Sequence, residues 1–146
     1  MVLNPDFVEF IKLLNDRNVL YLVVDGYAVA FHGYPRYTKD IDIWIYPDKK
    51  NAEKVIEVLK DFGFESLGLT LEDFSDPEQI IQLGRPPNRI DLMMDLEGVK
   101  FRECYSAKVE VDVDGINANF LDLNNLKKNK KATGRHQDLA DLENLS

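Results

Sequence analysis

Hydrophobic residues recur along this chain with two periods, one typical of helices and one typical of strands. Between residues 48 and 62 they fall on a single helical stripe. That stripe consists of Ala52, Val55, Ile56, Leu59 and Phe62. Residues 5–15 repeat the helical spacing behind Asn4 and Pro5, which suit a helix cap and a first turn. Residues 20–24 and 41–46 are short runs rich in β-branched residues, which predict buried strands.

The complete pattern predicts an α+β fold in which helices pack against a mixed sheet. Expected helices cover 5–15, 26–33, 48–62, 123–132 and 136–145, and expected strands cover 20–24, 41–46, 79–83, 89–94, 109–113 and 116–121. Residues 84–88 and 114–115 predict hairpin turns. Residues 64–71 are expected to form an extended segment and a turn. The length of 146 residues fits one domain, residues 1–146.

The composition limits the classes of function that the chain can serve. Its formal net charge of −8 argues against a general nucleic-acid scaffold, which needs a basic face, but is compatible with an enzyme that touches only an RNA end. The single cysteine, Cys104, cannot form an internal disulfide, so a reducing compartment is expected. No run approaches the roughly 18 apolar residues of a membrane helix, and the first residues lack the features of a signal peptide. We therefore expect a cytoplasmic protein with no membrane partner.

Asp40 and Asp42 alternate with isoleucines at the start of an expected strand. Side chains two residues apart on a strand lie on the same face, so both carboxylates point one way. Two carboxylates in an apolar strand repel each other and are costly to desolvate. A divalent cation relieves both costs, and Mg²⁺ prefers carboxylate ligands. The spacing alone is equally compatible with an edge strand that has one solvated face.

Glu110, Asp112 and Asp114 also alternate, in their case with valines, but their setting differs. They run directly into an Asp–Gly turn, which is a strong hairpin signal. This pattern predicts a half-solvated hairpin strand and not a metal site.

A strand–helix turn at Gly26 precedes the Asp40 strand. At such a turn the free backbone N–H groups and the helix dipole favour an anion. A phosphate site beside the carboxylate pair is one interpretation of this order, and a glycine that merely shapes a turn is the other.

Two neighbouring segments carry a recognisable signature. They read Leu22-Val-Val-Asp-Gly-Tyr-Ala-Val-Ala-Phe-His-Gly33 and Pro35-Arg36-Tyr-Thr38-Lys-Asp40-Ile-Asp42-Ile43. Together they resemble the signature of the DNA polymerase β-like nucleotidyltransferase superfamily, in which a Gly-Gly or Gly-Ser pair opens the helix and an Asp-x-Asp follows. The similarity is closest to small free-standing prokaryotic members, including abortive-infection-type toxins.

The resemblance implies a role for each matching residue. Gly26 would lie in the phosphate loop, and Asp40 and Asp42 would ligate Mg²⁺. The third carboxylate of the family lies on a later strand, which matches Asp91 within residues 89–94. Its implied role is the general base that takes a proton from the attacking hydroxyl. An outward-facing acid on an alternating strand is the alternative for Asp91.

Lys130 shares one face of its expected helix with Leu123 and Leu126, whereas Lys128 and Lys131 point away. A lysine that leans inward beside carboxylates is a candidate for binding phosphate as a point charge. The similarity of residues 130–142 to the family's C-terminal segment supports this role. A solvated basic helix end is the alternative.

The last expected helix, residues 136–145, has leucines at helical spacing. Leu139, Leu142 and Leu145 are therefore expected to face the core. Asp138 and Asp141 fall in its first turns, where acids favour the helix dipole without any further function.

Asp25 departs from the family pattern, because it stands where the family has its first glycine. A carboxylate about 4 Å from a triphosphate costs on the order of 1–4 kcal/mol. Aspartate tolerates the positive φ angle of such a turn better than most residues. Asp25 could pair with Arg36 or join the metal site. Arg36 and Thr38, in the loop that enters the Asp40 strand, are also candidate phosphate contacts.

The sequence thus predicts a Mg²⁺-dependent nucleotidyltransferase that moves a nucleoside monophosphate from an NTP to an acceptor hydroxyl. The acceptor would be an RNA end, a protein or a small molecule. The alternative is a catalytically impaired protein of this fold that binds another protein, for example in a toxin–antitoxin pair. A structural metal-binding protein is a third interpretation.

Overall fold

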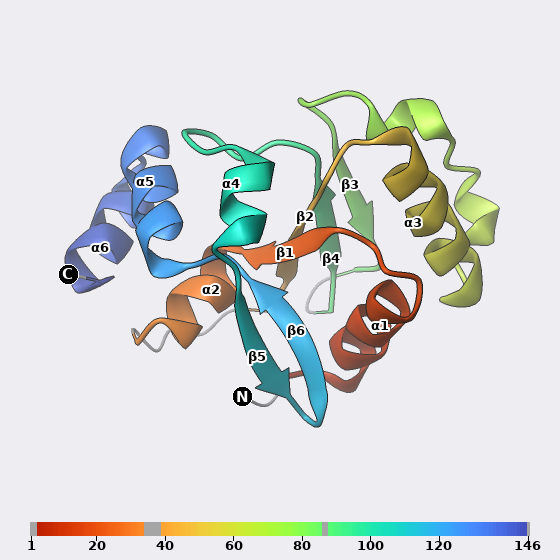
Figure 1. Ribbon diagram of the computed structural model, residues 1–146, viewed down its shortest axis with the longest axis horizontal. Helices are drawn as coiled ribbons and strands as arrows, with labels where there is room; N and C mark the ends of the chain where they lie inside the picture. Colours follow the sequence, from red (N-terminus) through yellow and green to blue (C-terminus); the bar gives the residue numbers. More distant parts are fainter. Residues whose placement is uncertain (1–2, 34–38, 86–87, 146) are drawn as a thin grey trace.

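The computed structural model of this protein describes residues 3–33, 39–85 and 88–145. Within these residues the strands form one six-stranded mixed sheet in the order β3-β4-β2-β1-β6-β5 (Figure 1). The strands are β1 (Tyr21–Val24), β2 (Ile41–Ile45), β3 (Ile80–Leu83), β4 (Ile90–Met93), β5 (Val109–Val113) and β6 (Ile116–Phe120). The pairs β1–β6 and β2–β4 are parallel, and the other neighbours are antiparallel. The expected α+β fold with a mixed sheet is confirmed.

The helices lie around this sheet (Figure 1). They are α1 (Pro5–Asp16), α2 (Asp25–Phe31), α3 (Lys49–Asp61), α4 (Phe101–Ser106), α5 (Leu123–Thr133) and α6 (His136–Leu145). Helices α1 and α3 contact each other on one side of the molecule, and α5 and α6 contact each other on the other side. Each of these elements except α4 was expected, with ends that agree to within two residues.

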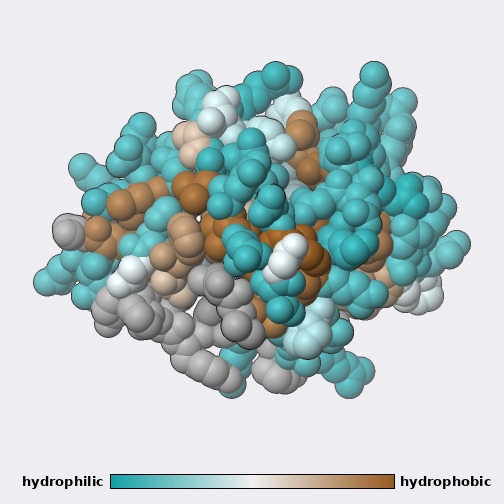
Figure 2. Space-filling view, turned by 60° about the horizontal axis from the view of Figure 1, so that its bottom comes forward, coloured by the Kyte–Doolittle hydropathy of each residue, from teal (hydrophilic) through white to brown (hydrophobic). Residues whose placement is uncertain are grey.

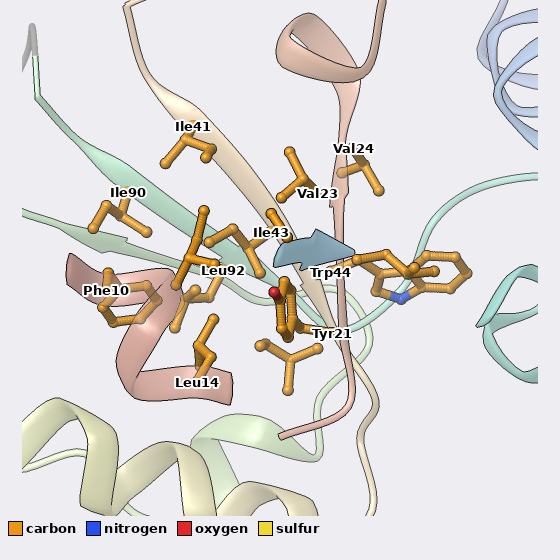
Figure 3. Close-up of a cluster of buried hydrophobic side chains, with 14 of the residues drawn as sticks. Phe10, Leu14, Tyr21, Val23, Val24, Ile41, Ile43, Trp44, Ile90 and Leu92 are labelled. Carbon is orange, nitrogen blue, oxygen red and sulfur yellow. The ribbon is translucent and has the colours of Figure 1, made fainter. Parts of the chain in front are cut away.

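The central strands present different chemistry on their two faces. On one face, Ile43 and Leu92 are partners in the β2–β4 register and lie above Leu14 of α1 (Figure 3). Trp44 points to the opposite face, where its ring meets that of Phe101 in α4. The first face is apolar throughout these strands and forms the main core. The second face carries both apolar and acidic residues, and it is therefore the face on which a polar site can be built.

Two segments differ from the expectation. The extended segment expected for residues 64–71 is wrong, because the chain forms the 3₁₀ helices η1 (Glu65–Leu67) and η2 (Leu71–Phe74) there. Thr70 and Asp73 close a reciprocal capping box at the start of η2, a local signal that hydrophobic periodicity does not register. Helix α4 was not expected, because six residues are too few to establish a helical period.

Asn51 of α3 binds three backbone groups beside the ends of β1 and β2, and two of them, the carbonyl oxygens of Leu20 and Tyr46, also accept backbone hydrogen bonds. Its side chain accepts a hydrogen bond from Leu20 N and donates to the carbonyl oxygens of Leu20 and Tyr46, and it is buried. Asn51→Ala removes all three hydrogen bonds and takes from Leu20 N the partner that Asn51 supplies, so we expect it to lower the free energy of unfolding by about 2 kcal/mol. Asn124→Ala, at an exposed position of α5, should change it by less than about 0.5 kcal/mol. Urea denaturation of both variants tests this, and equal effects would contradict it.

The surface is mainly hydrophilic on the face shown in Figure 2, where hydrophobic residues emerge near the middle. This agrees with a chain in which 30% of the residues are charged. Among the helices of the described residues, none is both long and apolar enough to cross a membrane.

Candidate active site

Asp42 and Asp91 are neighbours on the second face of the sheet. They are partners in the parallel β2–β4 register, so their side chains leave the sheet on the same side. On the other side of Asp42, the register partner is Val24, which directly precedes Asp25. Asp40 lies just before β2. The structure thus brings four aspartates together from three separate segments of the chain.

The electrostatics centre on Asp42. Burial is the main cause that raises the pKa of its carboxyl to about 7. Three neighbouring carboxylates, those of Asp25, Asp91 and Asp40, act in the same direction, and the Lys130 ammonium opposes them. A folded-state pKa above the ordinary value means that ionised Asp42 destabilises the fold as pH rises toward 7. A cation bound beside Asp42 would remove this cost.

Arg89, the residue before β4, neutralises part of the negative charge of this cluster. Its guanidinium donates two hydrogen bonds to Asp91, at 2.7 and 3.1 Å, and lies 3.2 Å from an Asp40 oxygen. Its backbone N–H also donates to Asp40. Sequence reasoning did not identify Arg89. The spacing could have identified it, because Arg89 and Asp91 are two residues apart and so lie on the same face of the strand.

Lys130 enters the cluster from α5. Only 1% of the residue is exposed, and its ammonium forms ion pairs with Asp25, with Asp138 at 3.2 Å and with Asp141 at 3.5 Å. Burial alone would lower the pKa of Lys130, but these carboxylates outweigh it, and the pKa is raised. Lys130 therefore stays charged inside the fold, while Lys128 and Lys131 are exposed.

Helix α6 turns a different face inward from the one expected. Leu139 is 50% exposed, Leu142 is half-buried, and the fully buried residues include Asp138 and Asp141. The expected leucine stripe is therefore wrong except at Leu145, and the two acids do more than favour the helix dipole. The physical reason is Lys130, since a buried ammonium needs carboxylate partners.

Asp138 is held ionised by these contacts. Burial would raise its pKa, but hydrogen bonds from Arg135, Thr133 and Lys130 outweigh burial and lower it well below the ordinary value. The spacing of Asp138 and Asp141 places both on one side of α6, directed at Lys130. A lysine on an apolar helix face, followed by two acids at helical spacing, is a signal that could have revealed this cluster.

Asp25 is the first residue of α2 and has a φ of 55°, in the left-handed region. Aspartate is one of the few side chains that tolerate this conformation. It pairs with Lys130, a partner that sequence reasoning did not consider for it. The following residue, Gly26, is buried within α2. Arg36, one of the partners considered for Asp25, and Thr38 lie outside the described residues.

The donor chemistry of the cluster fits a divalent cation such as Mg²⁺, because carboxylate oxygens are its preferred ligands and the Lys130 ammonium only partly offsets the negative charge around Asp42. The arrangement is nevertheless different from a formed metal centre. Within residues 3–33, 39–85 and 88–145, no three His, Cys, Asp or Glu side chains converge as ligands of one ion. Arg89 explains this, since it occupies oxygens of both Asp40 and Asp91.

Two hollows of the molecule lie away from the cluster. One, of about 300 Å³, lies between Ala52 of α3 and Phe74 of η2. The other, of about 210 Å³, lies beside Tyr46, Phe101 and Arg102. Neither is lined by an aspartate of the cluster. Among the described residues, the property that distinguishes the candidate site is its concentration of charge.

Comparison with known proteins gives matches in structure only. Neither a protein-family model nor a curated protein sequence matches the chain. The structure is similar to that of the lincosamide antibiotic adenylyltransferase LnuA in its lincomycin-bound form, with a TM-score of 0.57 and 16% identity, over 99% of this chain and 96% of that one. It is also similar to TM1012 from Thermotoga maritima, assigned as a nucleotidyltransferase, with a TM-score of 0.59 and 17% identity, over 99% of this chain and 94% of that one. Both similarities extend over nearly the whole length of each chain.

Proposed function

Because the chain has the nucleotidyltransferase fold, we propose that it is a Mg²⁺-dependent nucleotidyltransferase. It would move a nucleoside monophosphate from an NTP to an acceptor hydroxyl and release pyrophosphate. The observation that carries this proposal is the pairing of Asp42 with Asp91 across two parallel strands, at a position where the pKa of Asp42 is raised to about 7. A half-buried carboxylate crowded by other carboxylates is what a cation-dependent site requires.

Each residue of the site has a proposed role. Asp40, Asp42 and Asp91 would hold Mg²⁺, which when bound neutralises charge on the triphosphate and activates the acceptor hydroxyl. Asp91 would also accept the proton of that hydroxyl. The phosphates would be held by the four remaining candidates, which are Gly26, Arg36, Thr38 and Lys130. Positioning and charge compensation would supply most of the catalysis, as in other phosphoryl-type transfers.

The acceptor would be an RNA end, a protein or a small molecule. LnuA, which shares the fold at 16% identity, is an adenylyltransferase for a lincosamide antibiotic, a small molecule. The net charge of −8 disfavours extended contact with a nucleic-acid backbone. These two points favour a small acceptor or a protein over a long RNA. The proposed location is the cytoplasm.

A second candidate function is that of a catalytically impaired protein-binding module, for example in a toxin–antitoxin pair. The ion pair between Asp25 and Lys130 favours it, because an internal carboxylate already holds the lysine proposed to bind phosphate. The two candidates differ in a measurable property, since only the enzyme has to bind Mg²⁺ and an NTP together.

Calorimetric titration with each of the four NTPs, in the presence of Mg²⁺, tests the proposal. We expect binding of at least one NTP, and we expect Asp42→Asn to weaken it by about tenfold, or about 1.4 kcal/mol. The direction of the change in NTP affinity distinguishes the two cases. Without a bridging cation, removing the Asp42 charge would relieve repulsion and tighten NTP binding. Asp112→Asn, at an exposed position of β5, is the matched control and should have no effect. Tighter binding by Asp42→Asn, or no binding of any NTP, would overturn the proposal.

A further inference from the structure

Arg89 holds the carboxylates of the proposed metal site in a way that leaves little room for a cation. Its Nε lies 2.7 Å from one Asp91 oxygen, and its terminal nitrogen lies 3.1 Å from the other. Both oxygens of Asp91 are thus engaged by one planar guanidinium, the geometry that makes arginine–carboxylate pairs strong. The same guanidinium lies 3.2 Å from Asp40.

The backbone of Arg89 is fixed, whereas its side chain borders solvent. Its carbonyl oxygen accepts a hydrogen bond from Ile41 N, and its own N–H donates to the Asp40 carboxylate. The side chain retains 26% of its exposure, compared with 10% for Asp91. The guanidinium can therefore leave both carboxylates by side-chain rotation, without any change in the pairing of β2 with β4.

We propose that Arg89 is the resident counter-cation of this site, and that it exchanges with the divalent cation. In the protein without metal, its guanidinium occupies the Asp40 and Asp91 oxygens that the cation needs. Entry of the cation displaces it, because a guanidinium and a divalent cation at the same carboxylates repel each other strongly at contact distance. The displaced guanidinium is then available to an anion, and a triphosphate is the anion that the proposed function supplies.

The exchange makes the binding of metal and nucleotide cooperative. A cation that enters alone must separate Arg89 from two carboxylates. A cation that enters with a triphosphate binds at a smaller cost in free energy, because the freed guanidinium gains a new anionic partner. By linkage, the triphosphate raises the affinity for the cation by the same factor as the cation raises that for the triphosphate. The inference rests on the proposed function only for the identity of this anion.

Titration with Mn²⁺ alone, in the absence of nucleotide, tests the exchange directly. We expect Arg89→Gln to bind Mn²⁺ about fivefold more tightly than the unaltered protein, because a competing charge is removed. Arg89→Lys keeps the charge but cannot engage both oxygens of Asp91, so its affinity should lie between the two. Arg102→Gln, on α4 and away from the aspartates, is the matched control and should leave Mn²⁺ affinity unchanged.

A purely structural role for Arg89 predicts the opposite result, since loss of an organising contact would weaken Mn²⁺ binding. Weaker or unchanged Mn²⁺ affinity in both Arg89 variants would therefore overturn the inference, as would the absence of Mn²⁺ binding by every form of the protein. Circular dichroism shows whether each variant is folded, and Arg89→Lys provides the test if Arg89→Gln is not. Tighter Mn²⁺ binding by Arg89→Gln, combined with no binding of any NTP, would support the exchange while refuting the proposed nucleotidyl transfer.

Discussion

Replacing Lys130 by methionine is expected to lower the free energy of unfolding by about 3 kcal/mol. The substitution leaves Asp25, Asp138 and Asp141 without their shared ammonium, and removing one partner from a buried ion pair costs about 3–5 kcal/mol. The lower end of this range applies here for two reasons. Asp138 keeps its contact with Arg135, and the Asp25 side chain is 33% exposed and can be solvated.

Urea denaturation of Lys130→Met and Lys128→Met measures this effect against a matched control. Both substitutions remove one positive charge from α5, but Lys128 is exposed and should contribute less than about 0.5 kcal/mol. An equal loss of stability in the two variants would show that the ion cluster around Lys130 is not formed in solution. A loss confined to Lys130→Met would also support a structural role for Asp138 and Asp141, because both acids form ion pairs with this lysine inside the fold.

Replacing Asp25 by glycine is expected to tighten the binding of Mg²⁺·NTP by about 5- to 150-fold, which corresponds to about 1–3 kcal/mol. The substitution removes a carboxylate from the turn that would face the triphosphate. It also releases Lys130 from one of its three partners, so that the ammonium becomes available to phosphate. Glycine adopts the φ of 55° at this position without strain, and its added chain entropy lowers the stability of the protein only slightly.

Asp114→Gly is the matched control for this prediction. Asp114 has a φ of 54°, nearly the same as that of Asp25, but lies in the turn between β5 and β6. It should therefore reproduce the backbone effect of the substitution without any change in nucleotide affinity. Calorimetry and thermal melting of both variants separate the two effects. Weaker nucleotide binding by Asp25→Gly would make Asp25 a working ligand, and an unchanged affinity would favour the protein-binding module.

The sequence predicted the elements of this fold because their patterns are local. Helix α3 has a full amphipathic stripe, and the alternating residues of β5 lead directly into an Asp–Gly turn. The fold implied by resemblance to the nucleotidyltransferase superfamily is confirmed by the structural similarities. The proposed roles of the site residues remain predictions, although the register places Asp42 beside Asp91 as the shared strand face required.

The partners of Lys130 and Arg89 could not be predicted in the same way. Lys130 meets Asp25 from the opposite end of the chain, and periodicity carries no information about such a contact. The choice of leucines as the inner face of α6 failed for a related reason. By hydrophobicity, Leu139 is expected to be buried and Asp138 exposed. The buried Lys130 ammonium reverses this order, because leaving a buried charge unpaired costs more free energy than exposing a leucine.

The inner position of β1 also has a consequence for the newly made chain. β1 pairs with β2 on one side and with β6 on the other, where Val23 is the partner of Phe120. The ribosome delivers β6 long after β1, so an apolar strand keeps one open edge while the residues between them are made. Nascent chains that stall before residue 116 should therefore be prone to aggregate and to engage chaperones. Chains in which β6 has emerged from the ribosome should escape this fate, because the last open edge of β1 is then closed.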